Sequence, residues 1–110
     1  MIEGLWIVLY EGTGGGVGGV VVFIKGKVLG GDTAYTYIGS YQLQDKTFRA
    51  TVTVRNFLPD IPNVTGVVGN FELNLEGKLE GNTIRASGSV VSAHAIGVAL
   101  KLTKQADLPV

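Results

Sequence analysis

The chain has 110 residues, nine basic and nine acidic side chains, one histidine and no cysteine. This length suits one core, so we expect a single domain over residues 1–110. The balanced charge provides no field of one sign that would recruit nucleic acid or an anionic membrane. Without cysteine, and with one histidine, neither a disulfide nor a thiolate or multi-histidine metal site is available, and we expect no metal and no cofactor.

The N-terminal residues do not resemble a targeting segment. Residues 1–10 lack the basic start and the small-residue cleavage pattern of a signal peptide. Every apolar run is well short of the roughly 20 residues that a membrane-spanning helix needs. We therefore expect a soluble, cytoplasmic protein.

A glycine-rich stretch, EGTGGGVGG, follows the first apolar segment. Gly14, Gly16 and Gly19 match the spacing G-x-G-x-x-G. A dinucleotide site needs a helix after that motif, whereas the sequence VVVFI that follows here is typical of a strand. A glycine-rich hairpin connection is thus favoured over a phosphate-binding loop.

Apolar residues recur with a period of two along most of the chain, which predicts strands. In Thr47–Phe57, for example, Phe48, Ala50 and Val52 alternate with polar residues. The predicted strands are Ile2–Glu11, Gly16–Lys25, Lys27–Gly31, Thr33–Leu43, Thr47–Phe57, Val67–Leu79, Thr83–Val91 and Ala93–Lys104.

Turn residues separate these strands at short intervals, which predicts an antiparallel meander. Asp32, after Gly30 and Gly31, is expected to accept backbone N–H bonds and fix one turn. The longer connection Leu58–Gly66 contains two prolines and is the candidate for a cap or rim. Eight such strands form either a sandwich or a barrel. We prefer an all-β, antiparallel, eight-stranded up-and-down barrel, since closure removes the sheet edges.

Three tyrosines, Tyr35, Tyr37 and Tyr41, share one face of their strand. Facing inward, they suit either a filled core with buried water or a pocket for a small, partly apolar ligand. The hypothetical pocket consists of Tyr35, Tyr37, Tyr41, His94 and Trp6. An open cavity of several hundred Å³ would favour a ligand carrier or sensor, and a close-packed interior would oppose it.

His94 is the one candidate general base. Catalysis would require a nucleophile or an orienting carboxylate beside it, and a structural or pocket-lining role is favoured. We assign no catalytic residue and expect no enzyme, with a His94-based enzyme as a less favoured alternative.

Both faces of the first strand are apolar, and the second strand extends the pattern. Exposed apolar residues on adjacent strands indicate a contact surface, most simply that of a homodimer. The hypothetical dimer surface consists of Leu5, Ile7, Leu9, Val21 and Phe23.

Several stretches resemble a known family. Gly4-Leu5-Trp6 is similar to the G-x-W of lipocalin-type barrels, in which the tryptophan plugs the closed end. GKVLGGDTAYTYIGSY (Gly26–Tyr41) and NFLPDIPNV (Asn56–Val64) resemble the GrlR-like family of small bacterial barrels, over about the first two thirds of the chain. Its founding members are negative regulators of type III secretion gene expression.

The resemblance implies a lipocalin-like barrel, usually dimeric, that captures a transcriptional activator and does not contact DNA. In the best-known members an acidic run, Glu-Asp-Glu-Asp, grips the activator from the turn after the tyrosine-bearing strand. By position the run falls on Leu43, Gln44, Asp45 and Lys46, where only Asp45 is acidic. Gln44, Asp45 and Lys46 are therefore the candidate partner-binding turn, without the family's acidic residues. A regulator that binds protein is the first interpretation, and a ligand carrier is the second.

Overall fold

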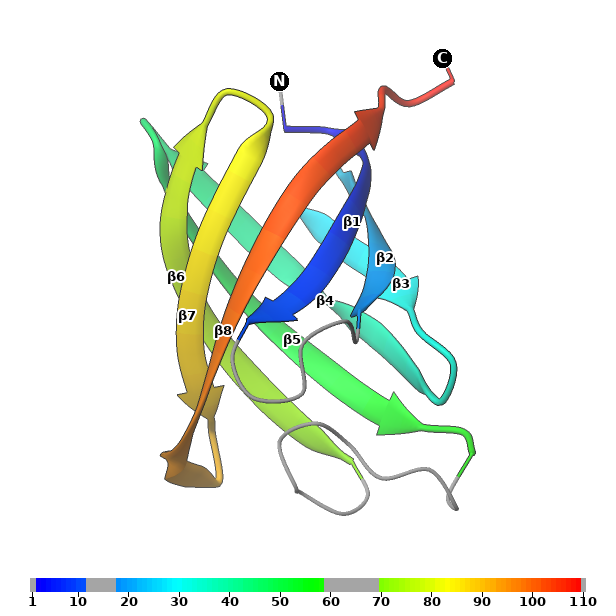
Figure 1. The fold of residues 1–110 in the computed structure, drawn as a ribbon, viewed down its shortest axis with the longest axis vertical. Helices are drawn as coiled ribbons and strands as arrows, with labels where there is room; N and C mark the ends of the chain where they lie inside the picture. Colours follow the sequence, from blue (N-terminus) through cyan, green and yellow to red (C-terminus); the bar gives the residue numbers. More distant parts are fainter. Residues whose placement is uncertain (1, 12–17, 59–69, 110) are drawn as a thin grey trace.

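The computed structural model describes residues 2–11, 18–58 and 70–109 and shows a closed barrel of eight antiparallel strands (Figure 1). The strands are β1 (Gly4–Glu11), β2 (Gly18–Ile24), β3 (Lys27–Gly31), β4 (Tyr35–Gln44), β5 (Thr47–Asn56), β6 (Phe71–Glu80), β7 (Thr83–Val90) and β8 (Ala93–Ala106). Each strand pairs with the next along the chain, and β8 pairs with β1. The predicted all-β barrel is confirmed.

The observed strand bounds lie close to the predicted ones, and β4 shows why they differ. It begins at Tyr35 and not at Thr33, because Asp32 Oδ1 accepts hydrogen bonds from the backbone N–H groups of Ala34 and Tyr35, both at 2.9 Å. An aspartate that binds the backbone two and three residues ahead holds a turn and delays the strand. The turn predicted at Asp32 is confirmed.

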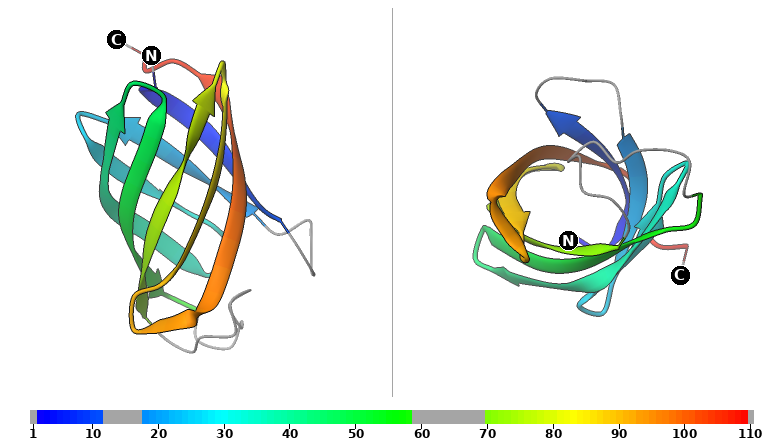
Figure 2. Two further views of the ribbon diagram at one scale, coloured as in Figure 1. Left: turned by 90° about the vertical axis from the view of Figure 1, so that its left-hand side faces the viewer. Right: turned by 90° about the horizontal axis from the view of Figure 1, so that it is seen from below.

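The strands surround one apolar interior, seen as a ring in the end-on view of Figure 2. The period-two pattern decides which side chains enter it: in β5, Phe48, Ala50, Val52 and Val54 are buried, and their neighbours Arg49 and Thr51 are exposed. Among the described residues, every fully buried side chain is apolar or aromatic. Burial of this surface is the main force that closes the barrel.

Aromatic rings fill the end of the barrel at which both termini lie (the top of Figure 1). Trp6 is fully buried, and its ring meets Phe23 edge-on with the centroids 5.7 Å apart. Phe23 in turn contacts Tyr41 at 5.0 Å and Phe48 at 5.5 Å. The indole N–H of Trp6 donates to the carbonyl oxygen of Ile2 at 2.7 Å, so its one polar atom is satisfied. These four rings close this end of the barrel.

The outside of the barrel has an apolar half on β1–β4. Its exposed residues include Leu9, Val20, Leu29 and Ile38, each between 44% and 50% exposed. The prediction that Val21 and Phe23 belong to this outer surface is wrong, because both are buried, at 4% and 1% exposure. Val21 pairs with the inward-facing Trp6, and this register turns Val20 and Val22 outward instead.

Candidate functional site

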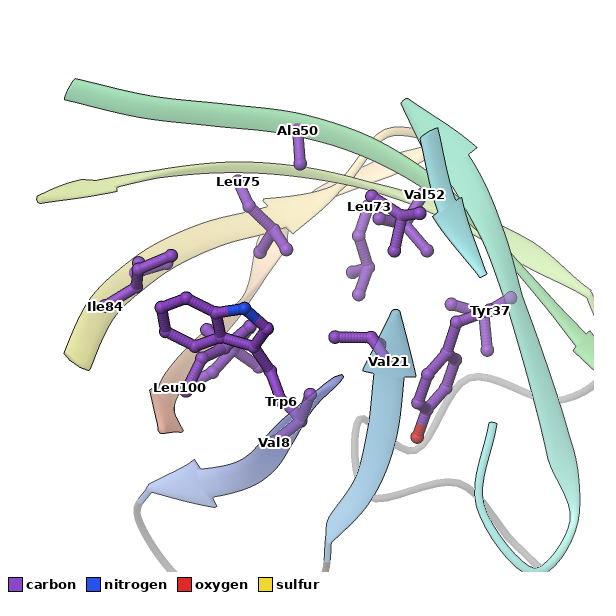
Figure 3. Close-up of a cluster of buried hydrophobic side chains, with 14 of the residues drawn as sticks. Trp6, Val8, Val21, Tyr37, Ala50, Val52, Leu73, Leu75, Ile84 and Leu100 are labelled. Carbon is purple, nitrogen blue, oxygen red and sulfur yellow. The ribbon is translucent and has the colours of Figure 1, made fainter. Parts of the chain in front are cut away.

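The barrel interior contains a cavity of about 40 Å³. Figure 3 shows several of the buried side chains around it, including Val8, Val21 and Tyr37. Its lining consists of Val8, Tyr10, Val21, Phe23, Val28, Tyr37, Phe48, Ala50, Val52, Val54, Leu73, Leu75, Leu100 and Leu102. Among these lining residues, all from the described part of the chain, only the two tyrosines carry a polar side-chain atom. In Figure 3 the ring of Tyr37 lies beside Val21, and its hydroxyl oxygen points away from Val52 and Leu73. The cavity is therefore apolar along its walls and polar where Tyr10 and Tyr37 stand.

A small polar cluster joins Tyr10, Tyr37 and Asp32. The hydroxyl of Tyr37 donates to Asp32 Oδ2 in a short hydrogen bond. The hydroxyl of Tyr10 lies 3.5 Å from that of Tyr37. The topology places Tyr10 at the end of β1 and Tyr37 near the start of β4, so the cluster lies at the end of the barrel opposite the termini.

A second hydrogen bond at this end joins Asn56 to Tyr35. The side-chain NH₂ of Asn56 donates to the Tyr35 hydroxyl at 2.9 Å, and its backbone N–H donates to Asn70 Oδ1 at 3.0 Å. The side-chain oxygen of Asn56 is buried, and within the described residues it accepts no hydrogen bond. Tyr35 is 3% exposed and belongs to the buried core, but it does not line the cavity.

The predicted pocket residues are thus only partly brought together. Tyr37 lines the cavity, whereas Tyr35, Tyr41 and Trp6 do not. Trp6 and Tyr41 belong to the aromatic end of the barrel, where both rings contact Phe23 edge-on. His94 lies in β8, and its side chain is outside the described part of the chain, as are residues 59–66 of the predicted cap and residues 12–17 of the glycine-rich stretch.

Tyr10 is a site residue that the sequence did not single out. It shares the inward face of β1 with Trp6 and Val8, and that alternation is the one signal that could have indicated it. Its partner Tyr37 lies on β4, which does not pair with β1, so the two meet across the barrel. Sequence periodicity does not report contacts of this kind.

The size of the cavity limits what it can hold. Sites for drug-sized ligands occupy roughly 300–1,000 Å³, against about 40 Å³ here. The interior is therefore largely filled by side chains, and a ligand enclosed whole, as in the carrier interpretation, does not fit it.

Burial changes the acid–base behaviour of the two tyrosines. It raises the pKa of the Tyr37 hydroxyl far above its ordinary value. Tyr10 and Asp32 raise this pKa further, because their ionised forms would repel a Tyr37 phenolate and because the Tyr37 proton is held in a hydrogen bond to Asp32. Burial also raises the pKa of Tyr10. Both hydroxyls stay protonated where those of an unfolded chain ionise, above a pH of about 10.

This shift predicts alkaline destabilisation. Below a pH of about 10 the folded and unfolded chains both hold the tyrosine protons, and above it only the folded chain does. The free energy of unfolding then falls by about 1.4 kcal/mol per pH unit for each such tyrosine. Urea unfolding at increasing pH measures this fall in the free energy of unfolding. Tyr37→Phe lacks one of the two titrating protons, so its slope with pH should be smaller by about 1.4 kcal/mol per pH unit. An unchanged slope in Tyr37→Phe would contradict the assignment.

The predicted partner-binding turn is exposed. Gln44, Asp45 and Lys46 are all on the surface, and Asp45 has a positive φ of 58°. The carbonyl oxygen of Lys46 accepts a hydrogen bond from the N–H of Leu79 at 2.8 Å, which ties the turn to β6. The meander places this turn at the end with the termini, away from the tyrosine cluster (Figure 1).

The apolar outer half of the barrel is a continuous surface. Leu5 pairs with Val22, Val22 with Leu29, and Leu29 with Ile38, so one unbroken row crosses β1–β4. A second row pairs Ile7 with Val20. We call this surface the β1–β4 face; it consists of Leu5, Ile7, Leu9, Val20, Val22, Leu29 and Ile38.

A polar groove of about 610 Å³ lies on the other half of the barrel, over β4–β7. Hydroxyl and amide side chains line it, including Ser40, Thr51 and Asn74. The Arg49 and Glu76 side chains in it are paired with each other, Nε to Oε2 at 2.6 Å. The groove therefore presents no unpaired charge from these two residues.

Metal and membrane-spanning features are not found in the described residues. There, no three His, Asp or Glu side chains lie close enough together to hold a metal ion. No helix with the length and apolar character of a membrane span occurs in the same part of the chain.

Comparison with known proteins identifies a family for this chain. A search of curated proteins finds none that is significantly similar. The family model described as "T3SS negative regulator, GrlR" matches residues 1–105, nearly the whole chain and beyond the two thirds that the resemblance covered. With this match and an eight-stranded barrel, the chain belongs to the GrlR family of type III secretion system negative regulators.

Proposed function

We propose that this protein lowers the expression of type III secretion genes by binding another protein, and that it does so as a homodimer. Membership of the GrlR family supports the regulatory role. The observation that supports the homodimer is the β1–β4 face, a continuous apolar surface with Leu29 and Ile38 about half exposed. Monomeric soluble proteins rarely expose such a surface without a binding partner.

A second copy of the chain suits the β1–β4 face. The face is uncharged, so two copies related by a twofold axis meet without opposing like charges. Polar residues flank it, with Lys27 exposed beside Leu29, and Thr53 paired with Ile38. An apolar centre with a polar rim is the usual anatomy of a homodimer interface.

Binding to protein is favoured over binding to DNA by charge. The nine basic residues are balanced by nine acidic ones. Arg49 and Arg85 are moreover paired with Glu76 and Glu11, at 2.6 and 3.0 Å. DNA binding depends on a basic surface that displaces counterions from the phosphates, and these arginines do not supply one. The proposed partner is a transcriptional activator, and the proposed location is the cytoplasm.

The regulatory role can be tested in the native host with a reporter fused to a type III secretion promoter. Deleting the gene should raise reporter output, and restoring the wild-type chain should lower it. A pull-down with the tagged chain should recover an activator of that promoter. Unchanged reporter output after deletion would contradict the proposed role.

The turn Gln44–Lys46 provides a separate test of where the activator binds. Asp45→Asn together with Lys46→Gln removes both charges and leaves the fold intact, because the two side chains are exposed. If the turn is the contact, this variant should recover several-fold less activator in the pull-down. Glu72→Gln, an exposed change on β6, is the matched control and should leave recovery unchanged. Equal recovery by all three proteins would exclude the turn as the contact.

A further inference from the structure

The polar groove over β4–β7 has no part in the proposed function. It lies on the other half of the barrel from the apolar rows of the β1–β4 face, and its lining, drawn from the described residues, does not include the turn Gln44–Lys46. Its volume of about 610 Å³ falls within the roughly 300–1,000 Å³ that small-molecule sites occupy. The groove is therefore large enough to be a binding site in its own right.

Strand register arranges the polar side chains of the groove in two rows. In the first row, Ser40, Thr51 and Asn74 lie directly opposite one another on β4, β5 and β6, which run side by side in Figure 2. The second row lies two residues further along each strand, crosses β4–β7 and consists of Gln42, Arg49, Glu76 and Ser87. All of these side chains are exposed. Because neighbouring strands lie about 4.8 Å apart, hydrogen-bonding groups recur at that spacing across the groove.

The first row both donates and accepts hydrogen bonds. The Thr51 hydroxyl donates to Asn74 Oδ1 at 3.1 Å, which orients the Asn74 amide. The Thr51 oxygen retains acceptor capacity, and the NH₂ group of Asn74 retains its donors. The Ser40 hydroxyl adds a further donor and acceptor. A ligand that matches this row must donate and accept at neighbouring atoms, as hydroxyl groups do.

The Arg49–Glu76 pair in the second row determines the charge that the ligand meets. Arg49 Nε donates to Glu76 Oε2 at 2.6 Å, and this hydrogen bond and the positive charge lower the pKa of the Glu76 carboxyl, which is ionised at neutral pH. The pair has no net charge, which favours a neutral ligand over an ion. The two side chains are 60% and 63% exposed, and the guanidinium has further N–H donors beside the carboxylate oxygens. Two neighbouring hydroxyls match this pair, one accepting from Arg49 and the other donating to Glu76.

The sheet beneath the groove favours a saccharide over an extended peptide. Strands β5 and β6 are each paired on both sides there, so a partner strand cannot extend the sheet at the groove. An extended peptide laid on the face of a sheet contacts it through side chains, because its N–H and C=O groups point sideways toward neighbouring strands. A sugar ring instead carries hydroxyls around its edge, and each of them donates and accepts.

The volume of the groove sets the size of the ligand. About 610 Å³ equals the volume of roughly 20 water molecules, at about 30 Å³ each in the liquid, and a disaccharide has a similar number of non-hydrogen atoms. We propose that the groove binds a neutral disaccharide, with two neighbouring hydroxyls on the Arg49–Glu76 pair and others on the first row.

Neutral disaccharides that differ in linkage and ring substituents test this proposal on the purified wild-type protein: maltose, cellobiose, lactose and N,N′-diacetylchitobiose. In a two-dimensional NMR titration, at least one of them should give saturable shifts at the amides of Thr51, Asn74 and Ser87. The affinity should be weaker than micromolar, because an open groove contacts only one side of the sugar. The neutral peptide acetyl-Ser-Thr-Asn-Ser-amide should give no saturable shift. Failure of every sugar to bind, or equal binding of the peptide, would overturn the proposal.

Two variants and a matched control locate the site. Arg49→Met together with Glu76→Met removes the charged pair, keeps side chains of similar length, and should weaken binding of the titrated sugar about tenfold. Thr51→Val removes one hydroxyl at nearly constant shape and should weaken binding several-fold. Arg85→Met together with Glu11→Met removes a similar exposed pair, 3.0 Å apart, that does not line the groove, and should bind as the wild type does.

Unchanged binding in both folded groove variants would overturn the proposal. The groove variants leave the β1–β4 face and the partner-binding turn as they are in the wild type. The outcome is therefore separate from that of the reporter, pull-down and sedimentation experiments.

Discussion

Trp6→Ala is expected to lower the free energy of unfolding by about 3–5 kcal/mol, the usual range for removing a buried tryptophan. Trp6 is fully buried, packs edge-on against Phe23, and donates its indole N–H to Ile2. The change removes the ring and leaves the Ile2 carbonyl oxygen without this donor. Because small domains are stable by only about 5–15 kcal/mol, a large share of the barrel's stability should be lost.

Urea unfolding followed by far-ultraviolet circular dichroism measures this loss. Trp6 is the single tryptophan of the chain, so its own fluorescence cannot report on the variant. Trp6→Phe should retain part of the stability because a ring still meets Phe23. Glu72→Ala, an exposed change on β6 outside the β1–β4 face, is the control and should cost about 0.5 kcal/mol or less. A loss below about 1 kcal/mol in Trp6→Ala would show that Trp6 does not hold this end of the barrel together.

Leu29→Glu is expected to convert the proposed dimer into a monomer. Leu29 lies in the middle of the row that runs from Leu5 to Ile38, and it is 49% exposed in the single chain. A twofold contact over this row would bury a glutamate from each copy without a partner. An unpaired buried charge costs about 3–5 kcal/mol, which raises the dimer dissociation constant a hundredfold or more.

Sedimentation velocity at tens of micromolar measures the effect. The wild-type chain should sediment as a dimer and Leu29→Glu as a monomer. Thr51→Glu places the same charge on the polar half of the barrel and should leave the dimer intact. Thermal unfolding is then compared at a concentration low enough for the wild-type dimer to dissociate. Equal midpoint temperatures for the wild-type and Leu29→Glu monomers would show that the substitution acts on the interface and not on the fold. A monomeric wild-type protein at this concentration would refute the dimer.

Much of the fold was predictable because it depends on local patterns. The alternation in Thr47–Asn56 identifies Phe48 and Val52 as inward and Arg49 as outward, and burial confirms each. Asp32 was predictable for the same reason, since its hydrogen bonds reach only residues two and three positions ahead. Interactions this short leave their signal in neighbouring residues.

The second strand shows where local pattern fails. Its core, VVVF, is apolar at every position, so an alternation of period two cannot indicate which side chains face inward. Only the pairing of Val21 with Trp6 decides that Val21 and Phe23 face inward and that Val20 and Val22 face outward. A shift of one residue in that register would exchange the two sets. The composition of the β1–β4 face therefore depends on a contact between strands.

Periodicity and turn chemistry act over a few residues, so the strands, their antiparallel pairing in chain order and the turn at Asp32 could be predicted. Three features could be known only from the folded barrel: which apolar residues form the β1–β4 face, how small the cavity is, and that Tyr10 meets Tyr37. These features depend on strand register, on the summed volume of inward side chains, and on a contact between β1 and β4 across the closed barrel. No stretch of neighbouring residues encodes such distances, since closure of the sheet sets them.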